Sequence, residues 1–244
     1  MFKTGLSLLT ATAAACGIML LSSCGGTMGG AKLNTAADSA AYAIGMANGF
    51  GMGQSLSTVP GDSLNVEILA RALRDGLKAD TSVMTPEKAQ MYIQEYFQKV
   101  QTALEEANKK AGQDFMAENG KKTGVVTTAS GLQYQILKEG TGVKPLATDT
   151  VEIHYKGTFL DGEVFDSSYD RGEPAKFVLN QVIPGWTEGV QLMKEGSKFI
   201  LWIPENLGYG ARALNPEKGG YQTLKFECEL LKVIPGKAAE EPKK

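Results

Sequence analysis

Six aromatic side chains in the C-terminal half of the sequence stand near turns, where a folded domain could use them to line a concave site. They are Tyr155, Phe165, Phe177, Trp186, Tyr209 and Phe226. Two of them carry hydroxyl groups, and Asp166 directly follows Phe165. Such a site would combine apolar walls with a few polar anchors, which is the usual composition of a pocket that binds a small apolar group.

The sequence lacks the motifs of covalent, phosphoryl and redox catalysis. It has no Gly-x-Ser-x-Gly segment, no P-loop and no dinucleotide fingerprint. The single histidine, His154, alternates with Ile153 and Tyr155 in a strand-like pattern without a nearby nucleophile, and we interpret it as structural or superficial. No pair among the cysteines and this histidine has zinc-ligand spacing, so we expect neither a metal nor a cofactor.

The charge balance is nearly even, with 25 basic and 27 acidic residues and a net charge of -2. Nucleic-acid-binding domains show a basic excess or a basic patch. No cluster of Lys and Arg interleaved with aromatic residues occurs here, so we expect no nucleic-acid partner. The 244 residues suffice for one large domain or two small ones.

The first residues of the chain have the features of an export signal. Lys3 supplies a positive start, and a largely apolar run that ends in small residues follows it. The segment LSSC, which ends at Cys24, resembles a bacterial lipobox. We therefore predict that residues 1–23 are a lipoprotein signal peptide and that Cys24 is lipidated. An ordinary signal peptide with an incidental cysteine is the alternative, and Cys16 is a weaker competing site.

Lipidation of Cys24 would anchor the mature chain in a bacterial cell envelope. Gly25 follows it and provides no aspartate-type retention signal, so the outer membrane is the default expectation, with the protein facing the periplasm or the surface. Cys228 would then remain as a free thiol, and its position in an alternating strand pattern indicates a packing role.

The elements that must position the aromatic residues begin after a glycine-rich, flexible tether at 24–33. Residues 34–120 have helical patterns and form a predicted helical domain. The first helix, Asp38 to Gln54, has large apolar residues four apart on one face and glycines four apart on another: Tyr42, Met46 and Phe50; Gly45, Gly49 and Gly53. Close approach of another backbone would explain the glycines, and a frayed helix is the alternative.

Two further helices complete the predicted helical domain. Val66 to Leu77 follows the three-four period, and a third helix begins at Thr85-Pro86-Glu87, where Thr85 can cap it. Glu105 and Lys109 are four apart and are expected to pair. The apolar line of the third helix has heptad spacing: Ile93, Phe97, Val100, Leu104, Ala107 and Ala111. We infer that this seam joins a second copy of the chain; a helix lying on its own domain is the alternative.

Beyond a linker at 121–130, the hydrophobic period falls to two. Residues 131–234 are predicted to form an antiparallel sheet with one short helix, Trp186 to Met193, and Asp161-Gly162 is a hairpin signal. Residues 235–244 form a charged tail that we expect to be disordered. The fold class is therefore α+β, with an all-helical domain before the sheet.

Three strings carry a resemblance to the FKBP-type peptidyl-prolyl cis-trans isomerases. They are VEIHYKGTFLDGEVFDSSYDRGEP, QVIPGWTEGVQLMKEGSKFILWIPENLGYGARA and TLKFECELLKV, and they cover nearly all of residues 130–234 in order. The helical region, DSAAYAIG and SGLQYQIL resemble the bacterial Mip-like branch, whose chains dimerise through helical N-terminal domains. The resemblance implies a five-stranded antiparallel sheet wrapped on a short helix. It also implies an enzyme that accelerates rotation of X-Pro bonds in polypeptide clients and so assists folding in the envelope.

The resemblance also implies roles for individual residues. Trp186 would be the floor of the pocket, beneath a bound proline ring. The amide of Ile183 and the hydroxyl of Tyr209 would donate hydrogen bonds to substrate carbonyls. Asp166 would be the polar group near the twisting peptide bond, oriented by Arg171. The walls would be Tyr155, Phe165, Phe177, Val182, Ile183 and Phe226.

The sequence departs from the family pattern at two places. Ala175 stands where many members have an aromatic wall residue, and the loop Leu214 to Gln222 replaces an apolar loop expected over the pocket. Within that loop, Glu217 and Lys218 occupy positions where aliphatic residues are common, which affects substrate preference and macrolide binding. The alternative function is a non-catalytic chaperone or binding module with a vestigial pocket.

Overall fold

The computed structural model describes residues 32–57 and 63–236 of the chain. The predicted signal peptide, the lipidation site Cys24, the competing Cys16 and most of the charged tail lie outside the described residues. The first described helix, α1 (Ala36–Ser57), begins at a capping box in which Thr35 and Asp38 exchange hydrogen bonds between side chain and amide, at 2.8 and 3.0 Å.

Helix α1 continues through its glycines without interruption. Its apolar side chains Tyr42, Met46 and Phe50 are all exposed. Within the described residues, no atom lies within 4 Å of a Cβ placed at Gly45, Gly49 or Gly53. The packing role of these glycines therefore stays a prediction.

Helices α2 (Val66–Leu77) and α3 (Pro86–Asn119) also begin at side-chain caps. The Asn65 side chain accepts hydrogen bonds from the amides of Glu67 and Ile68 at 3.0 and 3.1 Å, which satisfies two donors that the helix leaves unpaired. Thr85 accepts from the Lys88 amide at 3.4 Å, and Pro86 occupies the first turn. The predicted start of the third helix is confirmed. Among the described helices, none is long and apolar enough to cross a membrane.

The chain from Val125 to Ile234 forms one antiparallel sheet. Its strands are β1 (Val125–Thr127), β2 (Gln133–Lys138), β3 (Thr150–Thr158), β4 (Val164–Ser167), β5 (Ala175–Val178), β6 (Lys198–Ile203) and β7 (Leu224–Ile234). Their order is β1-β2-β6-β7-β3-β4, and β5 also pairs with β3. The long central pair of β3 and β7 joins the two halves of the sheet.

The predicted α+β class and the antiparallel sheet are confirmed, but the described sheet has seven strands in place of five. One reason is β1, a three-residue strand that pairs with the edge of β2. The other is the length of β3, which pairs with two short strands in succession. Its Thr150–Ile153 stretch faces β5, and its Lys156–Thr158 stretch faces β4.

A single hydrophobic core fills one face of this sheet. Helix α4 (Pro184–Leu192) lies against that face and contributes Trp186 and Val190 to the core. Side chains that point alternately inward from the strands meet it, as the predicted period of two requires, for example Val151, Ile153 and Tyr155 of β3. The core therefore fixes α4, with Trp186 near its start, relative to the strands.

The last turns of α3 pack against the sheet domain, and both ribbon views show them beside it. Gly112 and Asn119 are buried. A Cβ at position 112 would collide with the Thr223 hydroxyl, so this contact requires glycine. The Asn119 amide donates to Gln133 Oε1 at 2.9 Å, and Gln133 donates to the Met116 carbonyl at 2.7 Å. Ala107 and Ala111 of the predicted heptad seam are exposed and take no part in this contact with the sheet domain.

Candidate active site

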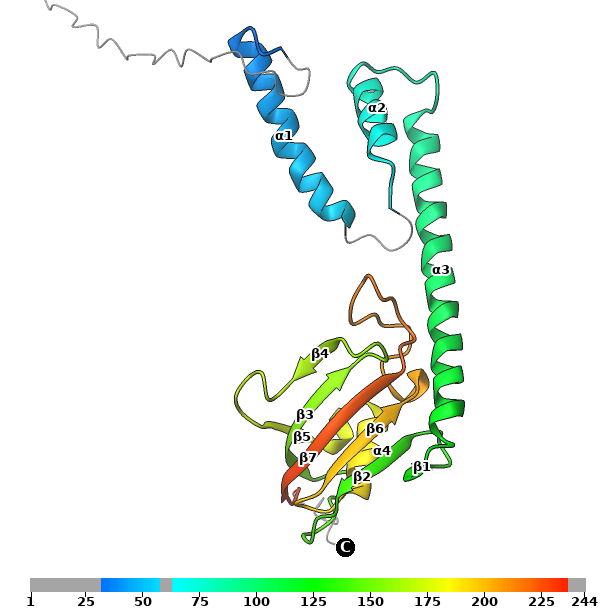
Figure 1. Ribbon diagram of the computed structural model, residues 1–244, viewed down its shortest axis with the longest axis vertical. Helices are drawn as coiled ribbons and strands as arrows, with labels where there is room; N and C mark the ends of the chain where they lie inside the picture. Colours follow the sequence, from blue (N-terminus) through cyan, green and yellow to red (C-terminus); the bar gives the residue numbers. More distant parts are fainter. Residues whose placement is uncertain (1–31, 58–62, 237–244) are drawn as a thin grey trace, which may run out of the picture. The chain divides into compact units, whose positions relative to one another are not determined.

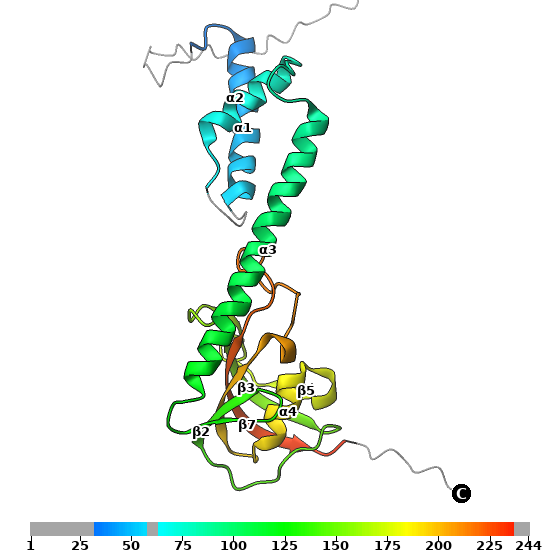
Figure 2. The ribbon, with the colours of Figure 1, turned by 90° about the vertical axis from the view of Figure 1, so that its right-hand side faces the viewer.

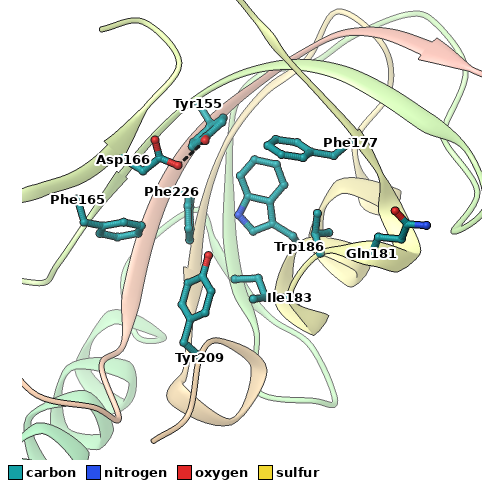
Figure 3. A pocket seen from close by; sticks show the side chains of 10 residues that line it. Tyr155, Phe165, Asp166, Phe177, Gln181, Ile183, Trp186, Tyr209 and Phe226 are labelled. Carbon is teal, nitrogen blue, oxygen red and sulfur yellow. Dashed lines mark hydrogen bonds between the residues drawn. The ribbon is translucent and has the colours of Figure 1, made fainter. Parts of the chain in front are cut away.

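The sheet and α4 enclose a cavity of about 300 Å³. Its wall is assembled from elements far apart in the sequence, and Figure 3 shows the side chains converging on one space. The lining residues are Tyr155, Phe165, Asp166, Phe177, Gln181, Val182, Ile183, Trp186, Tyr209 and Phe226. All nine pocket residues expected from the sequence are brought together here. Gln181, in the 3-10 turn η1 (Leu179–Gln181), was not expected.

Trp186 is the centre of the aromatic floor and is only 4% exposed. Its ring lies edge-on to those of Tyr155, Phe177 and Phe226, with centroid separations of 5.1, 5.5 and 5.2 Å. The indole Nε1 has no hydrogen-bond partner among the described residues, and it is directed toward the Phe226 ring. The edge-to-face contacts fix the indole plane, so that one face of it is held toward the cavity.

The position of Trp186 follows from the turn before it. Pro184 occupies the first turn of α4, where its missing amide hydrogen has no cost and its fixed φ suits the helix. The Thr187 hydroxyl donates to the Leu179 carbonyl at 2.5 Å and ties α4 to η1. The turn therefore aims Trp186 into the core side of the cavity and leaves Val182 and Ile183 at its edge.

Gly157 supports two of the lining rings, and sequence reasoning missed it. A Cβ at this position of β3 would lie 2.7 Å from Phe165 Cζ and 2.8 Å from Phe226 Cε1. Only glycine lets these two rings meet edge-to-face above the strand, with centroids 5.5 Å apart. A glycine inside an otherwise regular strand pattern marks a close approach, and that signal was present in the sequence.

The polar side of the cavity is a network of Tyr155, Asp166 and Arg171. The Tyr155 hydroxyl donates to Asp166 Oδ2 at 2.5 Å, and Arg171 Nη2 donates to the Tyr155 oxygen at 2.8 Å. Arg171 Nη1 also pairs with Asp166 Oδ1. Arg171, five positions after Asp166 in the chain, thus contacts the Asp166 carboxylate directly, as the predicted orienting role requires.

This network keeps Asp166 charged and Tyr155 neutral near pH 7. Burial raises the pKa of Asp166, but the hydrogen bonds from Tyr155 and Arg171 outweigh it and hold the pKa below the ordinary value of 3.8. Burial and the hydrogen bond to Asp166 raise the pKa of Tyr155 to about 12, against the opposing effect of Arg171. The cavity thus holds a fixed negative charge at one edge.

Two hydrogen-bond donors among the lining residues have no acceptor within the described chain. The Tyr209 hydroxyl is directed inward, and burial, aided by the Asp166 charge, raises the pKa of Tyr209. No described residue accepts a hydrogen bond from this hydroxyl. Ile183 precedes α4, and its backbone amide has no acceptor among the described residues, so this amide is open to a ligand.

Several other residues singled out in the sequence lie away from the cavity wall. His154 is stacked on Tyr169 at 4.6 Å and contacts the Ser168 hydroxyl at 3.0 Å, which fits the structural interpretation. Cys228 is a buried free thiol whose pKa is raised by burial. Ala175 packs partly buried against the core. Within the described part of the chain, no group of three or more His, Cys, Asp or Glu side chains could hold a metal ion.

The loop Leu214 to Gln222 does not line the cavity, although the sequence interpretation placed it over the pocket. Leu214 packs against the core, and the rest of the loop contacts other elements. Lys218 pairs with Asp161 and, at 3.0 Å, with Glu163. Lys218 is therefore used in ion pairs, and no residue of this loop lines the cavity above Trp186.

The arrangement suits non-covalent chemistry. The floor and walls are aromatic and aliphatic and would hold an apolar ring away from water. The Tyr209 hydroxyl and the Ile183 amide offer hydrogen-bond donors, and Asp166 offers a fixed charge. A site of this kind can change the relative free energies of two conformers of a bound group without forming a bond to it.

Sequence comparisons connect both halves of the chain with one family. Residues 142–231 match the family of FKBP-type peptidyl-prolyl cis-trans isomerases, and residues 37–136 match the domain amino terminal to FKBP-type peptidyl-prolyl isomerase. The chain is 45% identical over 203 residues to the FKBP-type peptidyl-prolyl cis-trans isomerase FkpA of Aeromonas hydrophila, which covers 79% of this chain and 74% of that protein.

Two further relatives extend the likeness to nearly whole proteins. The chain is 39% identical over 210 residues to outer membrane protein MIP of Legionella longbeachae, covering 83% of this chain and 88% of that one. The crystal structure of FkpA from Escherichia coli matches with a TM-score of 0.67 and 37% identity, over 84% of this chain and 99% of that chain.

Proposed function

The chain belongs to the FKBP-type peptidyl-prolyl cis-trans isomerases and rotates X-Pro peptide bonds, and we propose that it does so in the cavity above Trp186. The observation that carries this proposal is the convergence of nine expected side chains on one cavity of about 300 Å³. The proposed clients are proline-containing polypeptides of a bacterial cell envelope, whose folding slow X-Pro isomerisation can limit.

The reaction needs no nucleophile. Rotation about a peptide bond faces a barrier of about 18–20 kcal/mol because the resonance of the planar amide must be broken. A dry, apolar cavity disfavours the charge-separated planar amide relative to water, and preorganised donors can favour the twisted one. Each ~1.36 kcal/mol of such differential stabilisation gives a tenfold increase in rate.

Each polar group has a role in this scheme. Trp186 holds the proline ring, and the Ile183 amide and the Tyr209 hydroxyl donate to carbonyls that flank the rotating bond. Asp166, kept ionised by Tyr155 and Arg171, places a negative charge beside the twisting bond. Because these groups are held in place before the substrate arrives, they need no reorganisation as the bond twists.

The test is cis-to-trans isomerisation of a short X-Pro peptide by the wild-type chain and a matched pair of variants. Trp186→Ala is expected to lower kcat/KM by about tenfold or more, because it removes the floor. Trp202→Ala removes the other buried indole, which does not line the cavity, and serves as the control for lost stability. Tyr209→Phe is expected to lower kcat/KM less than Trp186→Ala. Wild-type rates in both Trp186→Ala and Tyr209→Phe would refute the site.

Anchoring of the chain to the envelope by a lipid on Cys24 is part of the proposal. The relative named outer membrane protein MIP supports an envelope location. Incorporation of labelled fatty acid should be lost in Cys24→Ala and kept in Cys16→Ala. Loss of the label in Cys16→Ala alone would show that the lipid is on Cys16. Absence of the label from the wild-type chain would show an ordinary signal peptide without lipidation.

Dimerisation through the helices is also proposed. Ile93 and Phe97 of the α3 seam are 54% and 37% exposed, and the matched family domain covers residues 37–136. Ile93→Glu is expected to shift the sedimentation of the chain from dimer to monomer, because it places a charge in the apolar seam. Gln94→Glu adds the same charge next to the seam and should leave the dimer intact. A monomeric wild-type chain would refute this proposal.

A further inference from the structure

The loop Leu214 to Gln222 is held on one side by α3. The Asn108 side chain donates two hydrogen bonds to loop carbonyls, to Lys218 at 2.6 Å and to Gly220 at 2.9 Å. One amide group thus closes the loop from the helix. A Cβ at Gly219 would lie 2.8 Å from Leu104 Cδ2, so the loop backbone also lies directly against the helix surface.

The other side of the loop is held by the turn between β3 and β4. The Lys218 ammonium pairs with Asp161 and with Glu163 at 3.0 Å, and it lies 5.2 Å from the centroid of the Phe159 ring. The Lys218 side chain is only 21% exposed, whereas its two partners are about half exposed. It bridges the loop and the turn, in contrast to a lysine on an open surface.

That turn leads directly into the wall of the cavity. The Phe159 amide donates to the Glu163 carbonyl at 2.9 Å and closes the turn. The Phe159 ring packs on Phe165 with centroids 5.1 Å apart. Phe165 and Asp166 follow in β4 and line the cavity. A continuous set of contacts therefore runs from α3 through the loop to one side of the candidate active site.

The loop adopts a backbone conformation that has a free-energy cost. Tyr221 has a φ of +56°, which is unusual for a residue with a side chain. Such residues persist only where the surroundings hold them, and they cluster at functional segments. Two contacts hold Tyr221 here. Its amide donates to the Gly210 carbonyl at 2.6 Å, and the Lys109 ammonium lies 3.6 Å from the centroid of its ring. This contact replaces the Glu105–Lys109 pair expected from the sequence.

We propose that Asn108 and Lys218 are positioning residues of the isomerase site. Asn108 of α3 fixes the loop, Lys218 fixes the β3–β4 turn to that loop, and the turn sets the place of Phe165 and Asp166. Helix α3 thus contributes to the geometry of the cavity without lining it. The inference rests on the proposed assignment of Phe165 and Asp166 to the isomerase site.

The first test compares lysine variants of the full chain on short X-Pro peptides. Lys218→Met keeps the aliphatic stem and removes the charge, and we expect kcat/KM to fall about three- to tenfold, because ~1 Å of misplacement can cost up to ~100-fold. Lys218→Arg restores a cation and should recover most of the rate. Lys176→Met breaks an ion pair with Glu152, away from the cavity, and should leave the rate unchanged.

The second test removes the hold of the helix. Asn108→Leu has a similar size and no donor, and we expect it to lower kcat/KM about as much as Lys218→Met. Gln101→Leu removes an amide that donates only to Glu105 of the same helix and is the matched control. Because both positions act through one loop, the double variant of Asn108 and Lys218 should lose little more rate than the worse single variant.

A spectroscopic readout separates positioning from general loss of stability. The backbone amide resonances of Phe165 and Asp166 should shift in Lys218→Met and Asn108→Leu but not in the two controls, at unchanged unfolding midpoint. Rates within twofold of wild type together with unshifted resonances would overturn the inference. Asp166→Asn is measured in parallel. A wild-type rate there removes the proposed site role of Asp166, while the resonance shifts still decide whether α3 positions β4.

Discussion

The N-terminal helices and the sheet domain differ in how far they bury their apolar side chains. All the buried apolar side chains of the described chain lie between Leu132 and Val233. Helices α1 and α2 bury none of their described residues. The sheet domain contains its own core, whereas most of the large apolar side chains described in α1 and α2 are exposed. A helix with an exposed apolar face gains most of its stability from packing against a partner.

Cavity-forming substitutions should give the largest difference between the two regions. Leu201→Ala, in the centre of β6, is expected to destabilise the sheet domain by about 2–5 kcal/mol, because a fully buried leucine leaves a void. Met46→Ala, on the exposed face of α1, should change the same unfolding transition by less than about 0.5 kcal/mol. Chemical denaturation followed by near-UV circular dichroism measures both. Equal losses would show that the two regions unfold as one unit.

Glycine-to-alanine changes should differ in sign. Gly157→Ala places a methyl group against Phe165 and Phe226, and overpacking of this kind costs about 1–3 kcal/mol. It should lower both the unfolding midpoint and kcat/KM. Gly45→Ala has open space around it and should raise the helix content of the dilute chain, since glycine costs about 1 kcal/mol relative to alanine. Circular dichroism across a dilution series compares the helix content of Gly45→Ala and the wild type. If the dimer of Gly45→Ala dissociates at a higher concentration than that of the wild type, a partner backbone packs against α1.

The polar network should give a smaller, pH-dependent effect. The folded pKa of Asp166 lies below 3.8, so its stabilising contribution is complete above that pH and is lost as the pH falls through the lower folded value. The activity should therefore stay level on the acid side until below about pH 4. Arg171→Leu removes a group that lowers this pKa, and the acid limb of the pH-rate profile should move upward. Arg71→Leu, on α2, is the control. An unmoved limb would show that Arg171 does not tune Asp166.

The smallest effect is expected from an ion pair on the exposed surface of α3. Lys99 lies 2.8 Å from Glu95, and both side chains are mostly exposed. Solvent screening leaves such pairs with little net stabilisation. Lys99→Met should produce no measurable change in the unfolding midpoint or in kcat/KM. A clear loss of rate would extend the influence of α3 on the cavity well beyond Asn108.

The expected site residues followed from the resemblance of three sequence segments to one family, and all of the expected pocket residues line one cavity. Gly157 and Gln181 were missed for different reasons. Gly157 interrupts a strand pattern and could have been noticed, whereas nothing in the local pattern marks Gln181, which lines the cavity as the last residue of η1. The boundary at 121–130 stays a prediction, and the contacts of Asn108, Gly112 and Asn119 place the end of α3 with the sheet domain.

By itself, the sequence determined the periods of the helices and strands, the cap at Thr85 and the hairpin at Asp161-Gly162, because these depend on residues a few positions apart. The tertiary structure decided the rest. It showed that the loop at Leu214 to Gln222 leaves the cavity and pairs with Asp161 and Glu163, and that a polar face of α3 holds it. Contacts between residues roughly a hundred positions apart carry no periodic signal, since they depend on which surfaces the folded core brings together.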